Sequence, residues 1–416
     1  MKNLAFYLFT LISSATFAQE NITLQKCYEL VAKHYPLANQ SDLLASQNKL
    51  DAQVISNSKL PQFNLEAQAT YQSDVIEVPI PNANIIPPNK DQYKATLTVN
   101  QLIYQGGMVN ATLKMKDAQL KTKQKQVEVS LYQIKQYINQ LYFSILLAQE
   151  SESLLYAKQD QLNAQLKEVK SGIENGVILP SSDKILEAEK LKINQKIKDL
   201  ESNKSSLISS LSQLINQTLN NETVFQKPII NIQLNSELTR PELELFNLKK
   251  DEISNNEIVL AKQKSPKLLG FALGGYGNPG LNMLDNSFQP YYIVGLKMQW
   301  NIFDWNSNSK QRKSLNINKN IIENEKDVFK LNTNIALQNQ QKTIENIESN
   351  IQSDAEIIKL RKDVLKMADS QLKNGVITSS AYITELTNLY EDQNTLIRHE
   401  IELQLAKANY NIIKGN

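Results

Sequence analysis

The sequence is poor in the residues that form catalytic centres and covalent cross-links. Its 416 residues include one cysteine, Cys27, and two histidines, His34 and His399. A single cysteine cannot form a disulfide within the chain. The two histidines lie far apart on helical patterns, which argues against a metal centre or a Ser/His/Asp triad. Because the sequence also has no glycine-rich phosphate loop and no Cys/His cluster, we expect no enzyme activity and no cofactor.

An excess of charge of one sign and long hydrophobic runs are also missing. The 45 basic and 43 acidic side chains leave a formal net charge of +2. No basic field therefore predicts a nucleic-acid partner. Beyond the N-terminus, no stretch approaches the roughly 18 consecutive apolar residues of a membrane-spanning helix. If the chain crosses a membrane, it must do so with strands.

The first 18 residues have the pattern of a secretory signal peptide. Lys2 precedes a short apolar segment at residues 4–11, and small residues then lead to Ala18. We expect cleavage after Ala18, so that the mature chain begins at Gln19. Cys27 lies too far beyond this site to serve as a lipid anchor. The alternative is a buried N-terminal helix of a cytosolic protein.

The chain is an internal duplication. Residues 175–178 read NGVI and recur at residues 374–377, and at the same offset Leu97 matches Leu296 and Tyr104 matches Phe303. So long a period indicates a duplication and not a solenoid. We expect a first repeat at 19–215, a polar linker at 216–240 and a second repeat at 241–416.

Each repeat reads as a helix, two strands, a very long helix and a shorter helix. Alternation of apolar and polar residues predicts the strands, and an unbroken heptad pattern without Pro or Gly predicts the long helices. In the first repeat we expect a helix interrupted at Pro36, strands at 62–73 and 92–104, a long helix at 107–173 and a helix at 181–215. In the second repeat we expect a helix, strands at 267–278 and 290–304, a long helix at 307–373 and a helix at 378–413.

These elements predict a mainly α fold with a small β part. The shorter helices are about half as long as the long ones, so two of them in succession can flank one long helix in antiparallel hairpins. Aromatic residues at the strand ends suit a membrane interface, although a soluble sheet with a buried aromatic corner has the same pattern. These strand-end aromatic residues are Tyr104, Trp300, Phe303 and Trp305.

Four strands are too few for a closed barrel. Bacterial membrane barrels start at about eight strands, and an open sheet in lipid would leave unpaired edges. We therefore expect copies of the chain to share one barrel, with two copies giving eight strands or three giving twelve.

Several segments resemble the TolC family of outer-membrane efflux proteins in their order and duplication. They are ITLQKCYELVAKHYPLA, LTVNQLIYQGG, LKMQWNIFDWN, the paired NGVI turns and LTNLYEDQNTLIRHEIELQLAKANYNIIKG. The resemblance covers essentially the whole mature chain. It implies a homotrimer with a shared twelve-stranded transmembrane β-barrel in outer-membrane lipid and an α-barrel tunnel that extends into the periplasm.

The resemblance also implies a function and partners. The partners are a periplasmic adaptor (membrane fusion) protein and an inner-membrane transporter. We therefore expect a channel subunit for efflux or export of small molecules, or of proteins. The alternative is an exported coiled-coil structural protein without a transport role.

One feature of the family is not evident in the sequence. In its best-known member, acidic residues narrow the tunnel entrance, and the corresponding positions here are Ala381 and Thr384. Three neighbouring acids are candidates for lumen-facing residues: Asp183, Glu187 and Glu385. Each of them could equally be an ordinary solvated helix charge.

The two NGVI segments are the most specific candidate site. Each follows a long helix, where Gly suits the left-handed residue that ends many helices. The apolar residues that follow could pack back between the two helices of their own hairpin, or could remain exposed and bind a partner. We predict that the partner-docking tips comprise Gly176, Val177, Ile178, Gly375, Val376 and Ile377.

Overall fold

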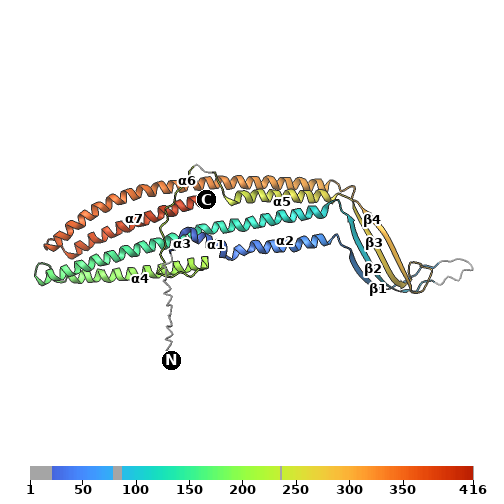
Figure 1. The fold of residues 1–416 in the computed structure, drawn as a ribbon, viewed down its shortest axis with the longest axis horizontal. Helices are drawn as coiled ribbons and strands as arrows, with labels where there is room; N and C mark the ends of the chain where they lie inside the picture. The colour runs from blue at the N-terminus through green and yellow to red at the C-terminus, as the bar shows by residue number, and fades with distance from the viewer. Residues whose placement is uncertain (1–20, 78–86, 235–236, 416) are drawn as a thin grey trace, which may run out of the picture. The chain divides into compact units, whose positions relative to one another are not determined.

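The computed structural model describes residues 21–77, 87–234 and 237–415. The expected signal peptide lies outside these residues. The fold is mainly α with four antiparallel strands, as the sequence predicts (Figure 1). The helices are α1 (Leu24–His34), the 3-10 helix η1 (Pro36–Asn39), α2 (Gln40–Asn57), α3 (Met108–Glu174), α4 (Ser182–Ile215), α5 (Pro241–Gln263), α6 (Ser307–Lys373) and α7 (Ser379–Lys414). The strands are β1 (Gln62–Tyr71), β2 (Asp91–Tyr104), β3 (Lys267–Asn278) and β4 (Gln289–Gln299).

The first helix is interrupted where the sequence places a proline. The Thr23 hydroxyl caps α1 by accepting a hydrogen bond from the backbone N–H of Lys26 at 3.2 Å. Residue 35 precedes Pro36 and adopts an extended conformation, with ψ of 135°, as residues before proline usually do. The chain re-enters a helix through η1. Among the residues that the structure describes, no helix is both long and apolar enough to cross a membrane.

The four strands form one antiparallel sheet in the order β1-β2-β3-β4. The central pairing, β2 with β3, joins a strand of the first repeat to a strand of the second. The register runs straight across the sheet: Leu65 pairs with Leu97, Leu97 with Gly274, and Gly274 with Tyr292. Within the described residues, β1 and β4 each pair on one side only.

Strand β4 ends at Gln299, five residues before the predicted end at 304. Its partner strand β3 begins at Lys267, which pairs with Gln299, so the residues after Gln299 have no strand opposite them. The chain then turns into α6. Trp305 and Asn306 both have positive φ, 53° and 60°, which a strand cannot accommodate. The Asp304 carboxylate accepts a hydrogen bond from the backbone N–H of Asn308 at 3.1 Å. Residues 300–306 therefore form a turn that caps the helix.

The chain divides into two compact units, and neither of them is a sequence repeat. Counting only the described residues, the tip unit lies within Met1–Ala38, Ser130–Arg240 and Leu331–Asn416, and the sheet unit lies within Asn39–Val129 and Pro241–Lys330. Helices α3 and α6 contribute residues to both units because each is 67 residues long. Each unit thus combines equivalent parts of the two repeats.

The tip unit contains the larger apolar clusters. In one of them, Tyr142 is fully buried against Cys27 and Phe225. The Tyr142 hydroxyl lies 2.6 Å from the carbonyl oxygen of Gln226 and 2.9 Å from that of Ile22. This cluster holds the linker after α4 in place, and a single parallel bridge joins Ile22 to Phe225.

Candidate functional site

Both NGVI segments end a long helix in the same way. Gly176 has φ of 72° and Gly375 has φ of 69°. The N–H of Val177 donates to the carbonyl of Gly172 at 2.9 Å, and the N–H of Gly176 donates to that of Ile173 at 3.0 Å. These two bonds form a Schellman motif.

The second tip repeats this geometry. The N–H of Val376 donates to the carbonyl of Gln371 at 2.8 Å, and the N–H of Gly375 donates to that of Leu372 at 3.0 Å. Each glycine thus reverses the chain where a residue with a side chain would be strained.

The apolar residues after the glycines divide into two kinds. The valines are exposed, Val177 at 55% and Val376 at 69% of their surface. The isoleucines are half-buried, and Ile178 and Ile377 both pack against the apolar cluster of the tip unit. Both alternatives from the sequence therefore apply, each to a different residue of the NGVI segment.

The two tips lie next to each other. A methyl group added to Gly375 would come within 2.9 Å of the carbonyl oxygen of Val177. One continuous apolar cluster contains residues from both hairpins, including Leu186 of α4 and Leu372 of α6. The Lys373 ammonium also reaches across to the Glu168 carboxylate at 3.1 Å. The exposed valines therefore belong to one surface of the tip unit.

In the sheet unit, one face of the sheet is largely apolar from β1 to β4. Residues paired across neighbouring strands point to the same face, so the register defines that face. Its polar members include Gln101 and Asn278. Its apolar members and glycines are Phe63, Leu65, Ala67 and Ala69 of β1, Tyr93, Ala95, Leu97 and Val99 of β2, Leu268, Gly270, Ala272, Gly274 and Tyr276 of β3, and Pro290, Tyr292, Val294, Leu296 and Met298 of β4. Leu65 and Tyr292 are among its most exposed members, at 79% and 78%. On the other face, β1 and β2 carry polar residues such as Glu66 and Thr96, whereas β3 and β4 carry apolar residues such as Leu273 and Ile293.

The predicted interface aromatics lie where the strands of this sheet join the helices, which we call the helix-side edge. Tyr104 is the last residue of β2, and the other three lie in the turn between β4 and α6. All four are exposed. The Trp300 indole N–H donates to the carbonyl of Lys264 at 2.9 Å, and the Phe303 and Trp305 rings are edge to face with centroids 4.8 Å apart.

Comparison with known proteins fits this geometry. Residues 37–182 match the sequence model of the family described as outer membrane efflux protein. No curated protein matches the chain in sequence. The fold is similar to that of CusC, with a TM-score of 0.70 and 11% identity, over 94% of this chain and 92% of that chain.

Two further outer-membrane proteins have similar folds. For the outer membrane protein VceC of Vibrio cholerae the TM-score is 0.65 at 15% identity, over 94% of this chain and 96% of that chain. For the open state of the MtrE outer membrane channel of Neisseria gonorrhoeae the TM-score is 0.67 at 13% identity, over 94% of this chain and 89% of that chain. Part of the chain, residues 37–182, thus resembles the outer membrane efflux proteins in sequence, and the fold is that of these outer-membrane proteins over 94% of the chain. Both comparisons agree with the predicted resemblance to this family and with the predicted location in the outer membrane.

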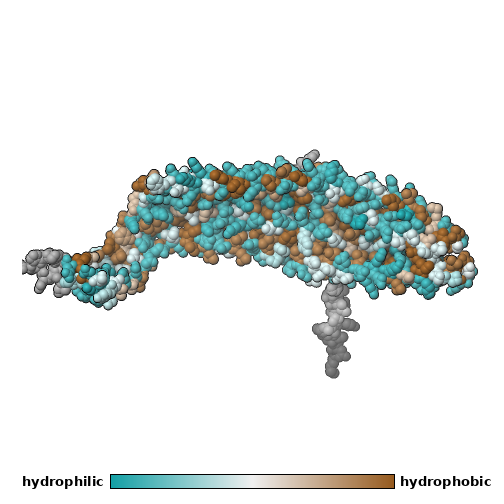
Figure 2. Space-filling model, turned by 180° about the vertical axis from the view of Figure 1, so that it is seen from behind, coloured by the Kyte–Doolittle hydropathy of each residue, from teal (hydrophilic) through white to brown (hydrophobic). Residues whose placement is uncertain are grey.

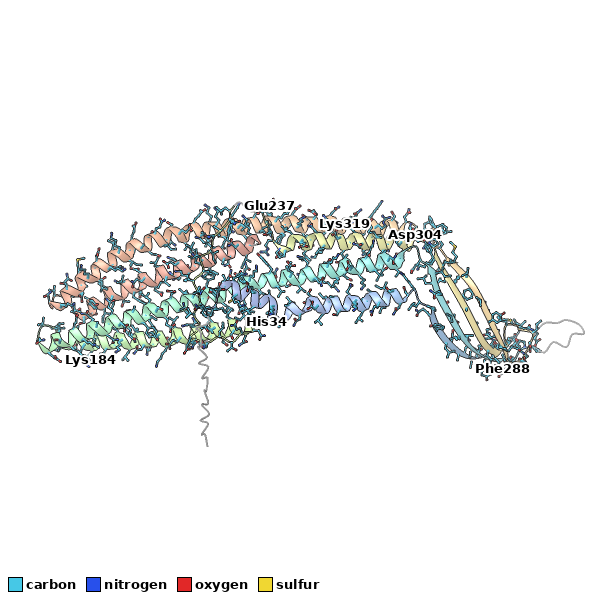
Figure 3. All side chains as sticks on the ribbon, in the orientation of Figure 1. His34, Lys184, Glu237, Phe288, Asp304 and Lys319 are labelled. Carbon is cyan, nitrogen blue, oxygen red and sulfur yellow. The ribbon has the colours of Figure 1, made fainter. Side chains whose placement is uncertain are left out.

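The three acids predicted as lumen-facing residues all have basic partners. The Glu187 carboxylate is 2.9 Å from both Lys170 and Lys184, and hydrogen bonds from these lysines hold its pKa below the usual range. Asp183 is 3.6 Å from Lys184, which lies close to the first tip (Figure 3). Glu385 is 3.6 Å from Arg361. Whether any of these acids faces a lumen stays a prediction.

A group of buried polar residues between the helices was missed in the sequence. The Lys158 ammonium of α3 is 3.2 Å from Glu189 of α4 and 3.3 Å from Thr387 of α7, and it lies 4.8 Å from the Tyr390 ring centroid. Burial lowers the pKa of Lys158, and the hydrogen bond to Glu189 opposes this shift. Lys158 thus joins both hairpins of the tip unit.

A cavity of about 580 Å³ between α3, α6 and α7 adjoins this group. The amide nitrogen of Gln165 borders the cavity and has no hydrogen-bond partner among the described residues. The sequence does contain a signal for both residues. Lys158 follows Leu155 of the heptad pattern by three positions, and Gln165 follows Leu162 in the same way, so polar side chains occupy positions that are usually apolar. The described residues contain no group of His, Cys, Asp or Glu side chains that could hold a metal ion.

Proposed function

We propose that three copies of this chain close into one duct through which small molecules leave the cell. The four-stranded sheets combine into a twelve-stranded barrel, and the helical hairpins form a tunnel on its periplasmic side. An inner-membrane transporter supplies the energy, and a periplasmic adaptor connects it to the duct. The passage itself is passive.

The sheet is the observation that carries this proposal. Its apolar face suits lipid, and its two edges have unpaired backbone groups that lipid cannot satisfy. The strands alternate in direction, so β4 of one copy runs antiparallel to β1 of the next in a closed ring. A barrel removes both edges at once.

Exposed apolar rows on two helices support the same arrangement, in which the β4 side of one copy meets the β1 side of the next. Helix α2 leads into β1 and carries Leu43, Leu50 and Val54 on its surface, and helix α6 follows β4 and carries Ile317, Ile321 and Val328. Their spacings of four and seven residues are those of a coiled-coil contact. In the ring, α6 of one copy would meet α2 of the next. Figure 2 shows brown, hydrophobic patches among the teal, hydrophilic surface on the face that it draws.

The hairpin tips are the proposed docking site for the adaptor. Val177 and Val376 are exposed next to each other although their neighbours Ile178 and Ile377 are packed. Exposed apolar clusters of this kind mark interaction sites. Three copies would present six such tips.

Two matched substitutions test the duct. Leu65→Arg places a charge on the apolar face, where it costs about 2–4 kcal/mol per chain near the middle of a bilayer. Glu66→Arg, one residue later, places the same charge on the opposite face. In planar bilayers we expect steady single-channel conductance from the unmodified protein, conductance with altered ion selectivity from Glu66→Arg, and little or no insertion of Leu65→Arg.

A coiled-coil structural protein would behave differently. It would give no conductance in any form, and Leu65→Arg would change neither its extraction from membranes nor its solubility. That result would refute the proposed duct.

A further inference from the structure

The helix-side edge of the sheet is strongly basic. The segments that enter and leave the strands there, residues 58–61, 102–110, 262–268 and 299–310, contain five lysines and a single acid, Asp304. We call these lysines the basic rim: Lys59, Lys262, Lys264, Lys267 and Lys310. Four of the five are exposed, and Lys267 is half-buried.

The opposite edge of the same sheet has the reverse charge. Its described residues, 72–77, 87–91 and 279–289, contain one lysine and four acids: Asp74, Glu77, Asp91 and Asp285. Figure 3 shows Asp304 at the helix-side end of the strands and Phe288 at the other end. The charge difference therefore runs along the strands, in the direction in which the sheet would cross a membrane.

The basic rim and the aromatic residues occupy the same edge. The Trp300 indole is bound to the backbone of Lys264, and Lys267 pairs with Gln299, the residue before Trp300. The Lys59 ammonium lies 3.3 Å from the Asn110 side-chain oxygen at the start of α3. Lys264 is 3.3 Å from Asp304, so one of the five lysines has a carboxylate partner on this edge.

We propose that the basic rim binds the headgroups of anionic phospholipids in the leaflet on the helix side of the sheet. Aromatic rings such as Trp300 and Trp305 lie at headgroup depth in membrane proteins, and lysine side chains extend from that depth towards phosphates. Each lysine near an anionic surface strengthens binding about fivefold. The proposal rests on the proposed function, because it needs the sheet to span a membrane. It adds the lipid class that this edge selects.

The protein contains a built-in probe for this contact. Its only two tryptophans, Trp300 and Trp305, both lie beside the basic rim, so all tryptophan fluorescence reports on this edge. We would reconstitute the full-length protein into vesicles of phosphatidylcholine and phosphatidylglycerol, with brominated acyl chains on one lipid at a time. Bromine quenches a tryptophan only in contact, so the two series compare how often each lipid occupies the edge.

We expect brominated phosphatidylglycerol to quench several-fold more strongly than its mole fraction predicts, and this preference to weaken in high salt. The triple variant Lys262→Gln, Lys264→Gln, Lys267→Gln should lose the preference, whereas arginine at the same three positions should keep it. Asp304→Asn retains a side-chain oxygen to cap α6 and should increase the preference. A matched control removes three lysines of α4 in the tip unit, Lys192, Lys196 and Lys198, and should leave the preference unchanged.

The outcomes separate the two proposals. Equal quenching by both lipids in the unmodified protein, or a preference that survives in the glutamine variant, would overturn the lipid-binding proposal while leaving the duct intact. If neither brominated lipid quenched, the edge would not lie in a bilayer, and the proposed duct would fail as well. A glutamine variant that did not insert would be compared with the arginine variant in detergent micelles containing the same lipids, where loss of the preference is again expected.

Discussion

Aspartate in place of both tip valines should abolish adaptor docking without unfolding the protein. In the variant Val177→Asp, Val376→Asp, the new charges lie on side chains that are already exposed. The glycines and their Schellman bonds stay intact. We therefore expect the free energy of unfolding to change by no more than about 0.5 kcal/mol.

The neighbouring isoleucines provide the contrast. Ile178 and Ile377 pack against the tip-unit cluster, and Ile178 lies so close to Gly172 that a methyl group added there would overlap its side chain. Aspartate at these positions removes the apolar burial of the isoleucine and places a carboxylate against a packed surface. We expect Ile178→Asp with Ile377→Asp to destabilise the protein by about 3 kcal/mol or more.

Adaptor binding, unlike stability, should depend mainly on the exposed valines. Burying one valine in an interface contributes about 1.5 kcal/mol, so each aspartate should weaken docking by about tenfold or more. The assays are urea unfolding, adaptor pull-down and efflux in cells that lack the native channel, with Val177→Leu, Val376→Leu as the control that should retain binding. Full efflux by the aspartate variant would show that the tips are not the docking site. Failure of that variant to assemble would show that the valines are needed for folding.

Three further predictions concern folding and processing. Gly375→Ala should destabilise the protein more than Gly176→Ala in urea unfolding, because both strain a positive φ by about 1 kcal/mol and only the former also meets the Val177 carbonyl. Burial raises the pKa of the Cys27 thiol to about 12, so a maleimide at pH 8 should label it only after unfolding. Since the raised pKa means that the folded state favours the protonated thiol, this contribution to stability is complete below about pH 9 and declines as the pH rises towards 12. N-terminal sequencing of membrane-extracted protein should return Gln19, and a sequence beginning at Met1 would contradict the expected cleavage.

Much of the fold was predictable because its signals are local. Pro36 interrupts the first helix, and alternation of apolar and polar residues predicts all four strands. Unbroken heptads predict the two long helices to within a residue. The end of β4 was placed too late because the aromatic residues after Gln299 continue the apolar pattern. The positive φ of Trp305 and the Asp304 cap depend on where α6 begins, which the strand pattern does not contain.

The details of the tips were not predictable, because they depend on contacts between distant segments. The sequence shows Val177 and Ile178 as two equivalent apolar residues, but in the fold Ile178 packs against the apolar cluster of the tip unit and Val177 is exposed. The same holds for Glu187, whose partner Lys170 comes from the neighbouring helix of the hairpin. The contact of Lys158 with Thr387 joins two helices across 229 residues of sequence.

Native mass spectrometry of the detergent-extracted protein tests the central claim most directly. The open edges of the sheet and the exposed rows on α2 and α6 require neighbouring copies, and the proposed barrel needs three. The account predicts a single major species with three times the mass of the mature chain. A stable monomer would contradict it, because β1 and β4 would then have to tolerate unpaired edges in a membrane.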